Sequence, residues 1–150
     1  MEQLKIMRSL YDEDFLDWTV KTAELIKNRQ FDSVDWDNVV EEIEALGRND
    51  RDKLISSLKV LFTHLLKWAY QPDKRTTIWE NTIFRERTNI SDYLEDTPSL
   101  SQFLVPEWIE KAYSRGLKIA VKETGLDRSV FPQKCPYELK QILDEEFLPG

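Results

Sequence analysis

The stretch LISSLKVLFTHLLKWA, residues 54–69, decides the fold. Leucine recurs in it at positions 54, 58, 61 and 65, and this spacing of three and four places the side chains on one face of an α-helix. Further apolar side chains widen the face: Ile55, Phe62, Leu66, Trp68 and Ala69. A wide apolar face is typical of a helix that other helices cover on several sides. We therefore predict that 54–69 is the most buried helix of a bundle.

The apolar stripe continues upstream of residue 54 in the same helical phase. Its upstream members are Trp36, Val39, Val40, Ile43 and Leu46. Gly47 leaves two alternatives, because it could end one helix with Asn49 capping the next, or it could lie inside a single helix. The phase is preserved across Gly47, which favours one long helix, with or without a kink, from about residue 36 to residue 70.

Helical patterns account for the rest of the chain, and no stretch alternates as a strand does. Three further helices are expected, from Asp12 to Arg29, from Thr77 to Glu95 and from Pro106 to Gly125. The capping box Ser99–Gln102 should open a short helix, and a last short helix is expected over 136–146. The sequence thus predicts an all-α bundle of about five to six helices in a single domain, residues 11–150. Residues 1–10 are expected as an N-terminal extension with freedom to flex.

The composition of the chain argues against several classes of function. With 150 residues, 41% of them hydrophobic, the chain can bury a core. Its 28 acids and 21 bases give a net charge of −7, which disfavours a broad nucleic-acid interface. One cysteine excludes an internal disulfide, and the sequence holds neither a zinc-ligand set nor a glycine-rich phosphate loop. Without an export signal or an apolar run of roughly 20 residues, we expect a cytoplasmic protein with no membrane contact.

Two features bear on partners. Residues 35–53 hold seven acids and three bases, whereas residues 67–87 hold five bases and three acids, which fits two neighbouring helices that attract each other. Ala112, Gly116 and Ala120 leave a smooth groove on one helix, which another helix of the chain or a partner chain could fill. On the second alternative, together with the many aromatic residues, we expect a protein partner or a homodimer.

Several segments of the chain match one family pattern in order and spacing. They are Tyr11–Phe15 with Trp18, Phe31–Asp35, Glu41–Arg48, Leu61–Trp68, Trp79 with Ile83 and Arg87, Pro98–Leu100, and Cys135–Tyr137. Together they resemble a bacterial family known as domain-of-unknown-function family 29, from about residue 11 to the C-terminus. The resemblance implies an all-helical bundle. It implies no activity and no catalytic residues, because the family is uncharacterised.

Carboxylates supply the first candidate site. Glu41 and Glu44 project about 60° apart on one flank of their helix, and paired carboxylates can bind a hard divalent cation. The plainer interpretation is a solvated acidic face, on which Glu44 pairs with Arg48 one turn later. Neither alternative is decided by the sequence.

Glu86 falls near the middle of the apolar side of the 77–95 helix. A carboxylate in that position has to be paired or protonated, and Arg87 lies at the edge of the same stripe. One interpretation is a buried ion pair that fixes how the helices dock. The other is a polar cavity in which Glu86 binds a metal or acts as a catalytic acid, with Arg87 as the nearby cation.

His64 and Cys135 are the remaining candidates. His64, the only histidine, projects to the boundary of the central helix, where it could act as a general acid or base or hydrogen-bond a neighbouring helix. Leu61 stands three residues before it, so the Glu-x-x-His pair of di-iron bundles is absent. Cys135 precedes Pro136 at an expected helix start, which could lower its pKa, although a thiol packed under the end of the bundle is the simpler interpretation.

Two classes of function follow from these features. The first is a protein-interaction or self-association module. The second is a metal-assisted hydrolase or nuclease, in which Glu41, Glu44 and Glu86 would converge on metal ions beside Arg87 or His64. We favour the first class and expect no cofactor. Convergence of the carboxylates in one pocket would distinguish the two.

Overall fold

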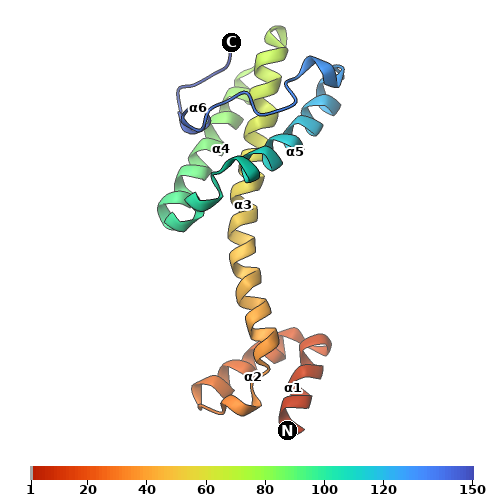
Figure 1. The fold of residues 1–150 in the computed structure, drawn as a ribbon, viewed down its shortest axis with the longest axis vertical. Helices are drawn as coiled ribbons and strands as arrows, with labels where there is room; N and C mark the ends of the chain where they lie inside the picture. Colours follow the sequence, from red (N-terminus) through yellow and green to blue (C-terminus); the bar gives the residue numbers. More distant parts are fainter. Residues whose placement is uncertain (1) are drawn as a thin grey trace. The chain divides into compact units, whose positions relative to one another are not determined.

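The computed structural model describes residues 2–150, and α-helices carry the fold throughout this range (Figure 1). The helices are α1 (Glu2–Glu13), α2 (Phe15–Lys27), α3 (Trp36–Tyr70), α4 (Thr77–Asp96), α5 (Pro106–Thr124) and α6 (Leu139–Leu143). Short 3-10 turns lie between them: η1 (Phe31–Ser33), η2 (Pro72–Lys74), η3 (Pro98–Phe103) and η4 (Arg128–Val130). Since no strand occurs among the described residues, the predicted all-α class is confirmed.

The chain divides into two compact units. Unit 1 ends at Arg48, and unit 2 comprises Asn49–Gly150. Helix α3 belongs to both, because it continues through Gly47 without a left-handed residue. The prediction of one long helix is therefore confirmed, and the alternative of a helix end at Gly47 is wrong. The preserved phase of the apolar stripe was the decisive signal.

The core of unit 2 surrounds the second half of α3. Leu54, Leu58, Leu61 and Leu65 are fully buried there. They pack with apolar side chains of α4, α5 and α6, among them Ile83, Ile90, Leu117 and Ile142. This burial confirms that 54–69 is the most buried segment, as its wide apolar face predicts.

Small residues bring α5 against α3. Ala112, Gly116 and Ala120 are all buried, and a Cβ atom on Gly116 would lie 2.7 Å from the carbonyl oxygen of Lys59. The Thr63 hydroxyl donates a hydrogen bond to the Gly116 carbonyl at 3.1 Å. The groove is thus filled by α3 of the same chain. The intrachain alternative is confirmed, and a groove open to a partner chain is wrong.

Helix ends follow capping chemistry, with some shifts from the predicted residues. Pro106 begins α5 and Gly125 ends it in the left-handed conformation, as predicted. The caps of α2 and α4 are Asp14 and Thr76, whose side chains accept from the backbone N–H three residues later, and not Asp12 and Thr77. Residues of cap-forming type that lie one or two positions apart compete, and the tertiary fold selects one of them.

Two short segments also differ from prediction. The expected helix opened by the capping box Ser99–Gln102 is the 3-10 turn η3, in which the Gln102 amide donates to the Ser99 carbonyl. The last helix is limited to Leu139–Leu143 and not 136–146, and its capping box begins at Glu138. In short segments of this kind, the burial of a few side chains determines the backbone conformation more strongly than local helix propensity does.

Unit 1 has a small core of its own. Met7, Trp18, Leu25 and Val34 are buried and contact one another across α1, α2 and the segment that leads into α3. Residues 1–10 were expected as an extension, yet from Glu2 they form most of α1; Met1 lies outside the described residues. Met7 alone in this helix is buried, which is why the sequence carries little sign of its packing.

Candidate functional site

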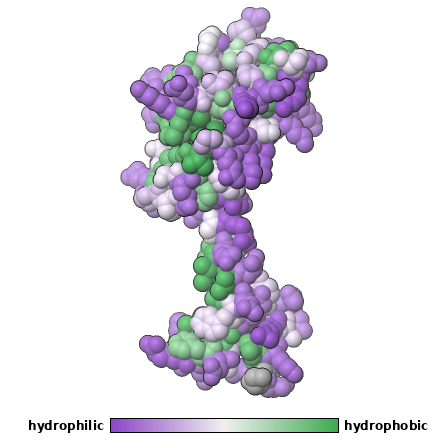
Figure 2. Space-filling view, in the orientation of Figure 1, coloured by the Kyte–Doolittle hydropathy of each residue, from purple (hydrophilic) through white to green (hydrophobic). Residues whose placement is uncertain are grey.

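The first third of α3 presents an apolar face that unit 1 covers only in part, where the Trp36 indole lies against the Phe31 ring and donates to the Phe31 carbonyl. We define the α3 face as Trp36, Val40, Ile43 and Leu46, which are 45%, 50%, 62% and 66% exposed. Val39, which lies one turn before Ile43 on the same side of the helix, packs against the core of unit 1. Figure 2 shows hydrophobic atoms at the surface over this part of α3. The sequence predicted the stripe correctly but not its exposure.

Apolar exposure is concentrated in unit 1. Nine of the 15 large hydrophobic residues that are exposed among the described residues lie in this unit, about a third of the chain. On α2, Leu16 and Val20 stand one turn apart and outside the buried line of Trp18, and both are at least half exposed. This second line is not among the surfaces predicted from the sequence, although its i, i+4 spacing is visible there beside the buried one.

Acidic side chains flank the α3 face. Between residues 36 and 47 the helix carries Asp37, Glu41, Glu42 and Glu44 and neither lysine nor arginine. Unit 1 as a whole holds 12 of the 28 acids but only 6 of the 21 bases, so it carries six of the seven net negative charges. The α3 face is therefore an exposed apolar strip with acidic side chains beside it.

One of these acids is held in place by unit 1 itself. The Tyr11 hydroxyl donates a hydrogen bond to the Glu42 carboxylate. This bond raises the pKa of Tyr11 to about 12, because it favours the protonated phenol. The contact joins α1 to α3, and Val40, Ile43 and Leu46 remain at least half exposed.

Two of the candidate metal ligands, Glu41 and Glu44, face solvent. Arg48 is 3.0 Å from Glu41 and 3.8 Å from Glu44, measured between guanidinium nitrogen and carboxylate oxygen. The pairing of Glu44 with Arg48 one turn later is confirmed. Among the described residues, no group of three or more His, Cys, Asp or Glu side chains is arranged to hold a metal ion.

Glu86 is buried, as its position on the apolar side of α4 predicts. Its carboxylate accepts from the guanidinium of Arg85 at 3.2 Å, and Arg85 is largely exposed. The predicted partner was Arg87, which bonds elsewhere. The exposed guanidinium of Arg85 thus compensates the buried carboxylate of Glu86. Long side chains at the edge of a core can do this because the stem lies along the apolar surface while the charged group stays in water.

Arg87 anchors the C-terminal segment to α4. Its guanidinium donates to three backbone carbonyls, those of Ile142 at 2.9 Å, Phe147 at 2.6 Å and Gln141 at 3.0 Å. Burial lowers the pKa of Arg87, and the carboxylates of the C-terminal segment oppose that effect. All the polar contacts of this side chain serve the fold, so Arg87 is a structural anchor.

His64 and Cys135 are also occupied by local contacts. His64 is half-buried, its Nδ1 lies 2.9 Å from the Val60 carbonyl of the preceding turn, and burial lowers its pKa. Burial raises the pKa of the Cys135 thiol to about 11, and its Sγ contacts the Tyr137 carbonyl. Cys135 precedes a segment that is not helical until Leu139, so the expected helix start that could activate the thiol is wrong.

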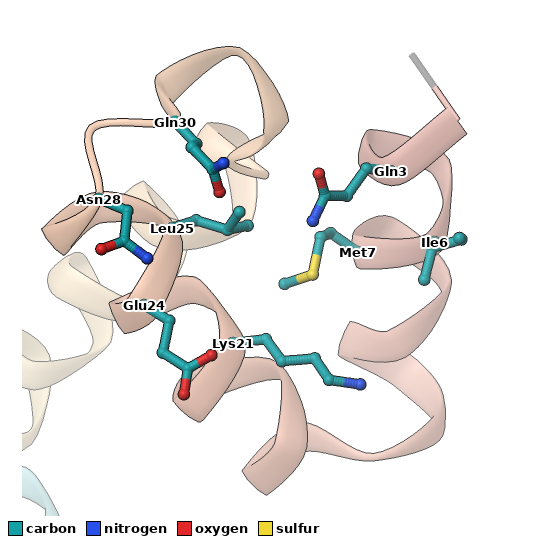
Figure 3. Close-up of a pocket in the computed structure, with 8 residues that line it drawn as sticks. All are labelled: Gln3, Ile6, Met7, Lys21, Glu24, Leu25, Asn28 and Gln30. Carbon is teal, nitrogen blue, oxygen red and sulfur yellow. The ribbon is translucent and has the colours of Figure 1, made fainter.

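A shallow pocket of about 310 Å³ lies between α1 and α2 in unit 1 (Figure 3). Met7 and Leu25 form its apolar floor, and amide side chains of Gln3 and Gln30 stand at its rim. Lys21 supplies the cation beside it, but the ammonium is 2.9 Å from the carboxylate of Asp17 and thus already neutralised. The pocket holds no arrangement of nucleophile, acid and base.

The comparisons with known proteins give one match. Residues 10–148 match the family model described as "Domain of unknown function DUF29". No curated protein and no solved structure matches the chain. Within residues 2–150, no helix has both the length and the apolar character that crossing a membrane requires.

Proposed function

The chain belongs to the family of domain of unknown function DUF29, and on that premise we propose that it acts as a protein-interaction module whose docking surface is the α3 face. The observation that carries the proposal is the exposure of Trp36, Val40, Ile43 and Leu46 on one side of a helix. Contiguous exposed apolar surface of this kind marks interaction sites in proteins.

The energetics support association on this surface. Burying a side chain such as leucine or isoleucine stabilises a complex by about 1.5–3 kcal/mol when it is fully covered. The four side chains of the α3 face are each about half exposed, so covering them contributes roughly 3–6 kcal/mol before the cost of association. Trp36 adds a large aromatic side chain of the type that anchors interfaces.

We place this function in the cytoplasm, because the chain's single thiol, Cys135, requires no oxidising compartment. The other class of function, a metal-assisted hydrolase or nuclease, has no comparable support. Its candidate ligands Glu41 and Glu44 share Arg48 at the surface of unit 1, whereas Glu86 is compensated by Arg85 within unit 2.

Site-specific photocrosslinking in the cells that naturally produce the protein tests the proposal. A benzophenone amino acid at position 43, on the α3 face, should give discrete adducts with another protein chain. The same group at Ile78, which is 75% exposed on α4, should give none. The partner, identified and purified, should bind the wild-type protein and lose that binding to Leu46→Asp. Adducts at position 78 alone, or none at either position, would overturn the proposal.

A further inference from the structure

The chemistry of the α3 face also identifies its occupant. We infer that the α3 face binds an amphipathic helical segment of another protein, whose apolar seam is flanked by lysine or arginine; this inference rests on the proposed function. Two observations carry it. One is the helical spacing of the exposed apolar residues, and the other is the sign of the charges on either side of them.

The spacing suits a helix as the docked element. Val40, Ile43 and Leu46 follow Trp36 at intervals of four, three and three residues, so the exposed side chains form one strip about 120° wide along α3. An apolar strip at three-and-four spacing packs against the matching strip of a second helix, as in helix pairs and helix-in-groove complexes. A peptide that binds by β-strand addition would need a free sheet edge, which the described residues do not provide.

The charges decide what flanks the seam of the partner. At 100° per residue, Asp37 and Glu44 project about 100–120° from the centre of the α3 face on one side, and Glu42 projects about 100° on the other. These are the positions that meet the flanks of a docked helix. Two bases lie nearby: Arg48 projects about 20° beyond Asp37 and is 3.8 Å from Glu44, and Arg8 lines the same pocket as Trp36 and Asp37. Acids nevertheless outnumber bases by six in unit 1. Lysine or arginine on the partner is therefore the complementary chemistry.

The same charges argue against a second copy of this chain on the α3 face. A two-fold pairing centred on Ile43 covers Trp36 through Leu46 in both copies, and it brings Glu42 and Glu44 of one copy against the same residues of the other. It also joins two units that each carry six net negative charges. Negative lipid headgroups would be repelled in the same way, since membrane-surface helices carry lysine and arginine on their polar face.

Two synthetic helical peptides of about 18 residues test the inference. Both carry leucine at three-and-four spacing; the flanks of the first are lysine and those of the second are glutamate. Binding of each fluorescently labelled peptide to the full chain is measured by anisotropy at low and high salt. The variants are Ile43→Asp on the α3 face and Ile78→Asp on α4, the latter as the matched exposed control.

The lysine peptide should bind the wild-type protein at least about tenfold more tightly than the glutamate peptide. High salt should weaken that binding, because the flanking charges are exposed. Ile43→Asp should weaken it by about tenfold or more, and Ile78→Asp should leave it unchanged. The double substitution Glu42→Gln with Glu44→Gln should reduce the preference for lysine without affecting the residual apolar binding.

Other outcomes would overturn the inference and leave the proposed function separately testable. Equal binding of the two peptides would show an apolar site indifferent to charge. A dimer of the protein alone, seen in light scattering and abolished by Ile43→Asp, would make a second copy the occupant. If the lysine peptide bound Ile43→Asp as well as wild type, the contact would lie elsewhere. Photocrosslinks at position 43 would uphold the interaction module in each of these cases, whereas their absence would remove both proposals.

Discussion

Replacing Leu61 with alanine should lower the free energy of unfolding by about 2–5 kcal/mol. The Leu61 side chain is fully buried in α3, in a core formed with α4 and α5. Its truncation loses apolar burial and leaves a cavity that close-packed neighbours on several sides cannot fill. Urea-induced unfolding followed by circular dichroism measures the change.

The matched control lies on the same helix. Ile43→Ala removes an apolar side chain that is 62% exposed, and it should change the free energy of unfolding by less than about 0.5 kcal/mol. Similar losses for the two variants would contradict the burial pattern of α3. A loss below about 1 kcal/mol at Leu61 would show that the other side of the helix faces the core.

Arg87→Met should destabilise the protein by about 2–4 kcal/mol, because three backbone carbonyls lose a charge-assisted hydrogen bond at once. Methionine keeps much of the apolar stem, so packing changes little. The effect should be local as well as global. Amide hydrogens of residues 139–148 should exchange faster in the variant, and hydrogen-exchange mass spectrometry resolves that segment from the rest of unit 2.

Arg115→Met is the control for Arg87→Met, since Arg115 is an exposed arginine on α5. It should leave both stability and exchange at wild-type values. Unchanged exchange over residues 139–148 in Arg87→Met would mean that the C-terminal segment is held by its apolar contacts alone. The anchoring role of Arg87 would then be wrong.

The strongest sequence signals predicted the architecture. Sixteen residues with a wide apolar face identified the central helix, and the unbroken phase across Gly47 identified α3 as one helix. Pro106 and Gly125 marked the ends of α5 because their backbone preferences leave few alternatives. Caps were less certain, since Asp12 and Asp14 offer the same chemistry two residues apart and only the packed fold chooses between them.

The candidate site was harder to predict, because periodicity shows which residues share a face and not whether anything covers it. Trp36 and Leu61 belong to one stripe, yet one is exposed and the other is buried. Two signals were present in the sequence: the run of acids beside Ile43, and Asp50, which falls on the line of the stripe between Leu46 and the buried leucines. A charge on the stripe indicates that the covered part of the helix ends there.

Predicted ionic partners failed for a related reason. Adjacency in sequence suggested that Glu86 and Arg87 would pair, but the structure pairs Glu86 with the other adjacent arginine, Arg85. Arg85 can bend back to Glu86 from the surface, whereas Arg87 meets carbonyls of a segment more than 50 residues away. The sequence contains no local sign of such a distant backbone partner.

Hydrogen exchange along α3, with and without the lysine-flanked peptide, tests the central claim most directly. In the free protein, amides of residues 40–48 should exchange faster than those of residues 54–69, because the α3 face lacks a covering helix. On binding, exchange in residues 40–48 should slow by about tenfold or more, with no change in residues 54–69. Slow exchange over residues 40–48 in the free protein, unaltered by the peptide, would contradict the claim that the α3 face is a docking surface.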